Sequence, residues 1–129
     1  MKACVIGLGN AGLPLAAAIS DAGVEVIGYD IDKKRVRQIN SGINPITEEG
    51  GLGEIMKRNC GKTLYATSDI KSCRDARVYI VLVPLLLDKK HKPDFSILKA
   101  AFKDVASVLK DDDLVILETT VPPGTTEDI

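Results

Sequence analysis

The residues best suited to chemistry in this sequence stand near its amino terminus, in the segment Gly7-Leu8-Gly9-Asn10-Ala11-Gly12. Its glycine spacing is that of a turn that binds a dinucleotide. In such a turn Gly7 allows the tight bend, Gly9 lets a pyrophosphate approach the backbone, and Gly12 lets the following helix pack closely. Free N–H groups at the start of that helix then face the phosphates. The segment therefore predicts a dinucleotide site, although a glycine turn without a nucleotide has the same spacing.

An acidic residue follows at the distance that such a site requires. Asp30 ends the apolar run 24–29, where its carboxylate can accept hydrogen bonds from both hydroxyls of the adenosine ribose. A 2′-phosphate at this position would meet a like charge, so the sequence favours NAD over NADP. Arg35 falls one turn into the next expected helix, close enough to Asp30 to lie over the adenosine end of a bound dinucleotide.

These residues are positioned by apolar runs that alternate with helical patterns. The expected strands are residues 3–6, 24–29, 63–67, 78–83 and 114–118. The first helix follows the glycine turn, and its apolar spacing predicts that it faces the sheet with Ala11, Leu15, Ala18, Ile19 and Ala22. The second runs from Asp32, as N-cap, to Asn40.

The rest of the chain contains two insertions in this pattern and one long helix. A short helix containing Leu52 and Met56 is expected inside the insertion 43–62, and a loop is expected at 85–93. A brief helix should open at Ser68 or Asp69, and cap residue types at 125–128 begin another. The long helix follows Asp94 as its cap, and its predicted buried stripe is Phe95, Leu98, Phe102, Val105, Ala106 and Leu109.

Alternating strands and helices predict an α/β fold of three layers, α/β/α. We expect a single Rossmann-type domain, a doubly wound parallel sheet with strand order 3-2-1-4-5. The carboxyl ends of all strands then share one edge, which carries residues 7–12, Asp30, Pro84 and Thr120. The dinucleotide is expected along that edge.

Composition narrows the choice of partners and compartment. The net charge of -1 predicts no attraction to nucleic acid or to an anionic membrane, and the apolar run 78–87 is too short to span a bilayer. Three irregularly spaced cysteines, without a secretory leader ahead of them, indicate a reducing cytoplasm. Cys4 and Cys73 fit core positions. His91 has no Cys or His at ligand spacing, so no metal site is expected.

Four segments carry a family resemblance: VIGLGNAGLPLA, VIGYDID with the following KKRV, NSGINPITEEGGL, and VILETTVPPGTTED. Together they resemble the nucleotide-sugar 6-dehydrogenases, which oxidise UDP-glucose, UDP-N-acetylmannosamine or GDP-mannose to uronic acids. The resemblance covers residues 1–129, but only the amino-terminal NAD-binding domain of that family. The central dimerisation domain and the carboxyl-terminal nucleotide-sugar domain, roughly two thirds of a multi-domain chain, are expected outside this sequence.

The resemblance implies a role for each matching residue. It places Gly7, Gly9, Asn10, Ala11 and Gly12 at the pyrophosphate, Asp30 at the adenosine ribose with Arg35 beside it, and Val83 and Pro84 on the nicotinamide side. Thr120 matches a threonine that binds the cofactor near the nicotinamide and the reacting centre, where its hydroxyl could orient a group or a water; a loop-capping hydroxyl is the alternative.

Two departures from the family pattern occur at this site. Asn10 and Ala11 stand where an aromatic and a β-branched residue are usual, although the backbone donors remain. Leu85 replaces a threonine, so one cofactor hydrogen bond, about 1 kcal/mol net, cannot form.

The resemblance also implies the reaction, a four-electron oxidation that uses two NAD molecules in succession. A primary alcohol becomes an aldehyde, a cysteine thiolate captures it, and the second hydride transfer leaves a thioester that water hydrolyses. None of Cys4, Cys60 and Cys73 occupies a matching position, so the nucleophile is expected outside this chain. The 129 residues are expected to bind NAD without turnover, and the full-length enzyme to be a homodimer or larger.

Two other functions remain open at this point. The β-hydroxyacid dehydrogenases share the GLGxxG opening, but many have an arginine where Asp30 stands and they lack TTVPPG. A regulatory module that senses NAD(H) has a similar fingerprint and length, but would not need the Pro-Pro-Gly loop or residues 45–52. Which sugar nucleotide is used stays open, because its pocket is expected outside these residues.

Overall fold

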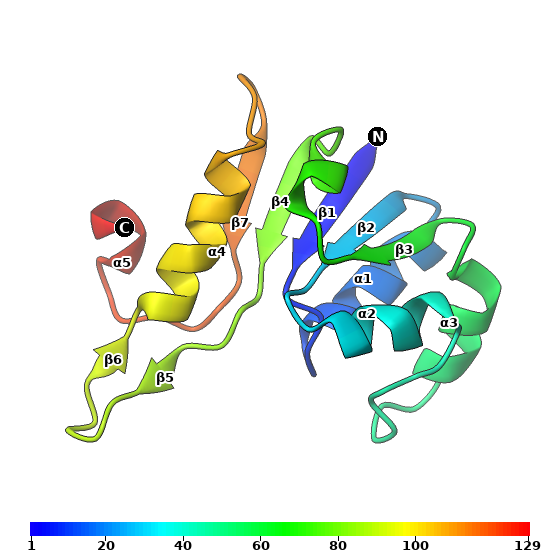
Figure 1. Ribbon diagram of the computed structural model, residues 1–129, viewed down its shortest axis with the longest axis horizontal. Coiled ribbons are helices and arrows are strands. Elements are labelled where there is room, and N and C mark those ends of the chain that lie inside the picture. The colour runs from blue at the N-terminus through cyan, green and yellow to red at the C-terminus, as the bar shows by residue number, and fades with distance from the viewer.

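Five parallel strands form the centre of the molecule, in the order β3-β2-β1-β4-β7. The computed structural model describes all of residues 1–129 (Figure 1). The strands are β1 (Lys2–Ile6), β2 (Glu25–Tyr29), β3 (Leu64–Thr67), β4 (Val78–Val81) and β7 (Leu114–Leu117). This order confirms the predicted doubly wound sheet, since β7 is the fifth strand of the expected 3-2-1-4-5 arrangement.

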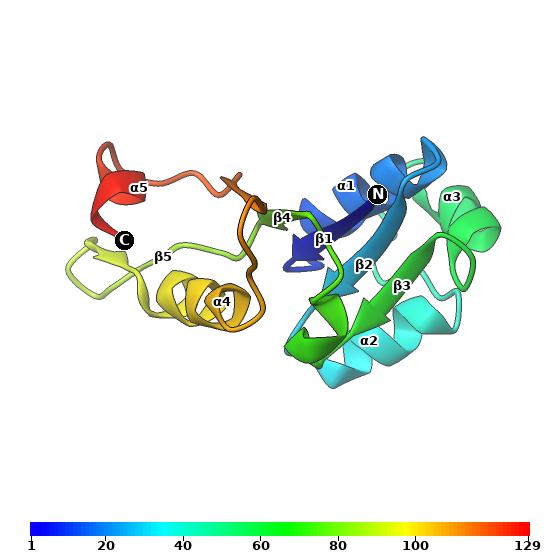
Figure 2. The ribbon, with the colours of Figure 1, turned by 90° about the horizontal axis from the view of Figure 1, so that it is seen from above.

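Helices cover both faces of the sheet and complete the three predicted layers. They are α1 (Gly12–Asp21), α2 (Lys33–Asn40), α3 (Leu52–Asn59), the short 3₁₀ turn η1 (Ile70–Cys73), α4 (Ser96–Ala106) and α5 (Thr125–Asp128). The core residues of α1, α2 and α3 pack in one cluster, and those of η1 and α4 pack in a second. Figure 2 shows α3 at one end of the molecule and α4 and α5 at the other. No helix combines the length and apolar character needed to cross a membrane.

Helix α1 buries a different face from the one predicted. Its buried residues are Gly12, Leu13, Ala16, Ala17 and Ser20, whereas Ala11, Ala18 and Ala22 of the predicted stripe are exposed. The helix is rich in alanine on more than one side, so its apolar spacing did not define one face. The small residues Gly12, Ala16 and Ser20 stand four apart and form a single row, which lets the helix approach the sheet closely.

The predicted caps are largely confirmed. Asp32 caps α2, because its Oδ1 accepts from the amides of Lys34 at 3.0 Å and Arg35 at 3.2 Å. Asp94 accepts from the Ser96 amide at 2.9 Å, although Phe95 occupies the N-cap position itself.

The predicted stripe of α4 was partly wrong. Leu98 and Val105 are buried, but Ala106 and Leu109 are exposed, and Ala101 and Val108 are buried in their place. The helix ends at Ala106, so the chain no longer follows a helical period at Leu109.

The segment predicted as a loop at 85–93 contains a small antiparallel ribbon. Strand β5 (Leu86–Leu87) pairs with β6 (Pro93–Asp94). The Asp88 carboxylate closes the turn between them by accepting from the amides of Lys90 at 2.7 Å and Lys92 at 3.0 Å. The contacts that form this ribbon are local and polar, and no alternation of apolar residues in the segment predicted it.

The three cysteines give a labelling prediction. Cys4 and Cys73 are fully buried in the core, as predicted; a hydrogen bond to Cys73 and burial raise the pKa of the Cys4 thiol. Burial also raises the pKa of Cys60, which is only half-buried. We expect a maleimide at neutral pH to modify Cys60 alone, and slowly, in the folded protein and all three thiols in urea, as measured by mass spectrometry. Rapid modification of Cys4 or Cys73 in the folded protein would contradict this packing.

Candidate functional site

The glycine turn joins β1 to α1 and is shaped by close backbone contacts. Gly7 has a φ of 95°, donates its amide to the Tyr29 carbonyl at 2.8 Å, and would bring a Cβ within 2.8 Å of the Leu82 oxygen. A Cβ on Gly12 would overlap the backbone oxygen of Gly7. Both glycines are therefore required by the fold itself.

Gly9 differs from the other two glycines of the turn. A Cβ built on it would meet no protein atom within 4 Å, and its φ lies outside the left-handed region. Beside it, the N–H groups of Asn10, Ala11 and Gly12 have no acceptor within the protein. Open space next to unpaired backbone donors at a helix start is what a pyrophosphate requires, so the turn fits a dinucleotide.

Leu8 is the most tightly held residue of the turn. Its amide donates to Asp30 Oδ2 at 2.9 Å, and its carbonyl accepts from Arg35 Nη1 at 2.8 Å. Its side chain is 1% exposed and lies over Gly28, where a Cβ would come within 2.6 Å of Leu8 Cδ2. The two peptide groups that flank Leu8 are thus each held by a side chain from the segment that follows β2.

Asp30 stands at the carboxyl end of β2, as predicted, and is half-buried. In addition to the Leu8 amide, it accepts from the amide of Asp32 through Oδ1 at 2.9 Å. Each carboxylate oxygen has a second lone pair, so both oxygens can still accept a ribose hydroxyl. The guanidinium of Arg35 donates to the Leu8 carbonyl and forms no ion pair with Asp30, so the two residues are linked through Leu8.

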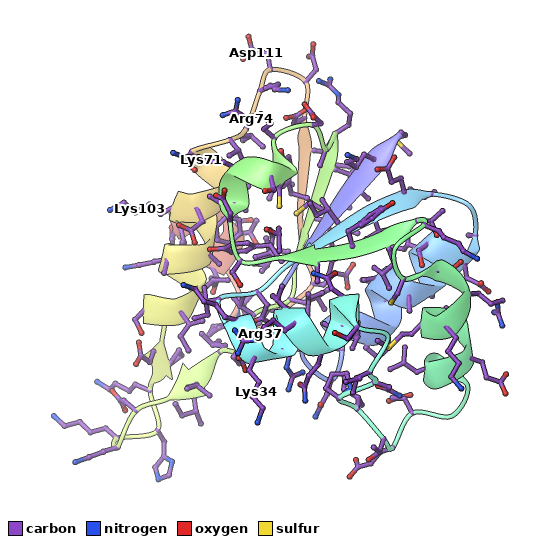
Figure 3. All side chains as sticks on the ribbon, turned by 45° about the vertical axis from the view of Figure 1, so that its right-hand side comes forward. Lys34, Arg37, Lys71, Arg74, Lys103 and Asp111 are labelled. Carbon is purple, nitrogen blue, oxygen red and sulfur yellow. The ribbon has the colours of Figure 1, made fainter.

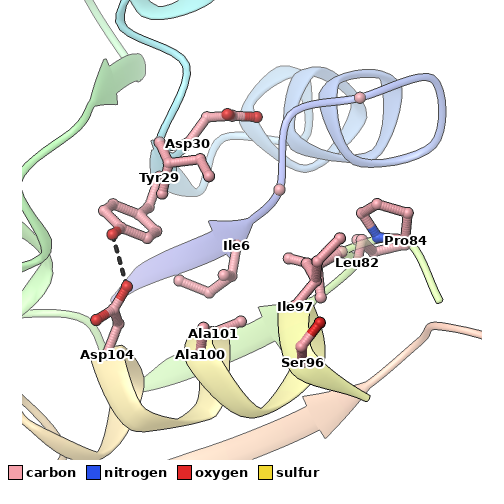
Figure 4. Close-up of a pocket in the computed structure, with 14 residues that line it drawn as sticks. Ile6, Tyr29, Asp30, Leu82, Pro84, Ser96, Ile97, Ala100, Ala101 and Asp104 are labelled. Atoms are coloured by element: carbon pink, nitrogen blue, oxygen red, sulfur yellow. Dashed lines mark hydrogen bonds between the residues drawn. The ribbon is translucent and has the colours of Figure 1, made fainter. Parts of the chain in front are cut away.

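A cavity of about 500 Å³ opens beside the turn, between the sheet edge and α4 (Figure 4). Its volume is in the range of small-molecule sites, and its walls are mostly apolar. Five predicted residues line it: Gly7, Gly9, Asp30, Val83 and Pro84. The sequence alone did not indicate two parts of the cavity wall. One is the end of β2 and the turn after it, with Tyr29 and Ile31, and the other is α4, with Ser96, Ile97, Ala100, Ala101 and Asp104. The small residues Ser96 and Ala100, four apart at the start of a helix, were the available signal.

Five predicted site residues do not line this cavity: Asn10, Ala11, Gly12, Arg35 and Thr120. The first three form the start of α1 beside it. Thr120 is exposed after β7, and its hydroxyl makes no hydrogen bond within the protein. The neighbouring Thr119, which sequence reasoning passed over, donates its Oγ1 to the Val83 carbonyl at 2.7 Å and ties the ends of β7 and β4 together.

A parallel sheet with this order, a glycine turn open at Gly9, and a carboxylate at the end of β2 define a Rossmann-type dinucleotide-binding domain. Comparison with known families gives the particular one: residues 1–129 match the "UDP-glucose/GDP-mannose dehydrogenase family, NAD binding domain". The chain belongs to this family, is its NAD-binding domain, and has NAD as its cofactor. The resemblance read from the sequence is thereby confirmed, and the match decides between the families that the glycine turn left open.

Curated relatives agree with this assignment. A UDP-N-acetyl-D-mannosamine dehydrogenase of Pyrococcus horikoshii is 38% identical over 130 residues, which cover 98% of this chain and 30% of that protein. One of Salmonella typhi is 43% identical over 124 residues, covering 95% of this chain and 29% of that protein. The chain therefore spans about 30% of the length of the relatives it matches.

Solved structures agree as well. A UDP-D-ManNAc dehydrogenase of Pyrococcus horikoshii superposes with a TM-score of 0.95 at 36% identity, covering 99% of this chain and 30% of that one. A ternary complex of GDP-mannose dehydrogenase from Pseudomonas aeruginosa gives 0.91 at 27% identity, covering 100% and 30%. These relatives are oxidoreductases, and the shared region is their NAD-binding domain.

Proposed function

We propose that this chain holds NAD for a nucleotide-sugar 6-dehydrogenase that oxidises UDP-N-acetylmannosamine, or alternatively UDP-glucose, to the uronic acid with two NAD consumed. The observation that carries the proposal is the open space at Gly9 beside three unpaired amides, with the Asp30 carboxylate facing the same turn. The name shared by several relatives supports UDP-N-acetylmannosamine as the first choice of substrate. When bound, NAD supplies the acceptor for the hydride that leaves the sugar alcohol.

The residues of this chain then bind and orient. The amides of Asn10, Ala11 and Gly12 hold the pyrophosphate, and Asp30 accepts from the ribose. Val83 and Pro84 form the wall on the nicotinamide side, and the hydrogen bond from Thr119 keeps Val83 in place. Thr120, exposed and without an internal partner, orients a group or a water at the reacting centre.

The chemistry of the second step requires a thiolate that this chain does not place near the cavity. Cys4 and Cys73 are buried in the core, and Cys60 follows α3 on the other side of the sheet from α4. We therefore propose that the 129-residue protein binds NAD without turnover. From the family resemblance we also propose that the whole enzyme is cytoplasmic and is a homodimer or a larger assembly.

Two measurements test this proposal on the 129-residue protein. Calorimetric titration with NAD, NADH, NADP and AMP should show binding of NAD and a weaker affinity for NADP, because of the charge on Asp30. Incubation with NAD and UDP-N-acetylmannosamine, UDP-glucose or GDP-mannose should produce no NADH absorbance. Absence of NAD binding would overturn the cofactor site, and NADH formation would overturn the claim that the chain is inactive alone.

A further inference from the structure

The carboxylate of Asp104 lies on the cavity wall and has no role in the function proposed above. Asp104 lies near the end of α4, is half-buried, and lines the cavity together with Ala100 and Ala101. The hydroxyl of Tyr29 donates to its Oδ2 at 2.7 Å (Figure 4). This hydrogen bond joins the end of β2 to α4 at one end of the cavity.

The direction of that hydrogen bond fixes what Asp104 offers to a ligand. Tyr29 is 7% exposed, and burial together with the hydrogen bond to Asp104 raises the pKa of its hydroxyl above the ordinary value. The hydroxyl therefore stays protonated and donates, while the carboxylate accepts. The other oxygen, Oδ1 of Asp104, receives no hydrogen bond from the protein. That oxygen is an oriented acceptor held in place by its partner.

Asp104 stands at the end of the cavity where the base of a dinucleotide belongs. Figure 4 shows Asp30, Tyr29 and Asp104 at one end and Pro84 and Ser96 at the other. If the ribose binds Asp30, the base would lie in the part of the cavity lined by Ile31 and by the small side chains Ala100 and Ala101 of α4. Asp30 and Asp104 are the two carboxylates among the residues that line the cavity, whose other walls here are apolar.

We propose that Asp104 accepts a hydrogen bond from the 6-amino group of adenine and so selects adenine over bases with an oxygen at that position. The inference rests on the proposed NAD site. Hypoxanthine carries a carbonyl where adenine carries the amino group, and a carboxylate cannot donate to that carbonyl. Tyr29 is the positioning residue that keeps the carboxylate in the required orientation.

The test compares NAD with nicotinamide hypoxanthine dinucleotide by calorimetric titration. The wild-type protein should bind the hypoxanthine dinucleotide about tenfold or more weakly, the effect of one hydrogen bond to a charged group. In Asp104→Asn, the amide oxygen can still accept from Tyr29, which turns the NH₂ group toward the cavity as a donor. This variant should lose the preference for NAD or reverse it.

Two further variants separate this role from general effects. Asp111→Asn removes the same charge on the exposed loop between α4 and β7 and should keep the wild-type ratio (Figure 3). Tyr29→Phe keeps the carboxylate but removes its anchor, and should lower the ratio without reversing it. Equal affinity of the wild-type protein for both dinucleotides would overturn the inference even if Asp104→Asn failed to fold. So would an unchanged ratio in a folded Asp104→Asn. Failure of the wild-type protein to bind either dinucleotide would instead overturn the NAD site itself.

Discussion

Replacement of Gly9 by alanine is expected to weaken NAD binding by about 10- to 100-fold while leaving the stability of the protein unchanged. A Cβ at this position meets no protein atom within 4 Å, and the backbone needs no left-handed conformation. The methyl group would occupy only the space proposed for the pyrophosphate. Titration calorimetry measures the affinity, and urea unfolding measures the free energy of unfolding, which should change by about 0.5 kcal/mol or less.

Gly12→Ala provides the matched control within the same turn. Here the added methyl group overlaps the backbone oxygen of Gly7, so the start of α1 must move away from β1. We expect a loss of about 3 kcal/mol in the free energy of unfolding together with the loss of NAD binding. If Gly9→Ala were destabilised to the same degree, or bound NAD as tightly as the wild-type protein, the space above Gly9 would not be the pyrophosphate site.

Asp30→Ala is expected to weaken NAD binding by about 100-fold and to reduce the preference for NAD over NADP. The substitution removes the acceptor for two ribose hydroxyls and leaves the amides of Leu8 and Asp32 without their partner. It also removes the negative charge that opposes a 2′-phosphate. Parallel calorimetric titrations with NAD and NADP measure both effects.

Arg35→Met separates the support of the turn from recognition of the ribose. The variant removes the hydrogen bond to the Leu8 carbonyl but leaves the Asp30 carboxylate and its bond to the Leu8 amide in place. We expect about a tenfold loss of NAD affinity with an unchanged NAD to NADP ratio.

An Asp30→Ala protein that still rejected NADP as the wild-type protein does would show that another group sets the cofactor preference.

Much of the architecture could be predicted because its signals are local. Each strand is an apolar run bounded by glycine or polar residues, and the right-handed crossover rule then leaves the observed order as the simplest one. The caps at Asp32 and Asp94 act on amides two or three residues away, so they too can be read from the sequence. The glycine spacing and Asp30 fall in one strand-helix-strand unit for the same reason.

The features that could not be predicted from the sequence depend on contacts between distant residues. The buried face of α1 is decided by the approach of Gly12 to the Gly7 backbone, since an alanine-rich helix offers apolar positions on several sides. Leu8 is held by contacts with Asp30, Arg35 and Gly28, which the fold brings beside it. No residue spacing in the sequence indicates these contacts.

The sequence by itself determined the parallel sheet, the glycine turn, the acid at the end of β2 and the family. Each of these depends on residues that stand close together in short segments of the chain. Only the tertiary structure decided how the site is walled: α4 is brought against the end of β2, and Tyr29 meets Asp104 across 75 positions of sequence. The physical reason is that a cavity is formed by side chains from separate elements, and their meeting depends on packing of the whole core.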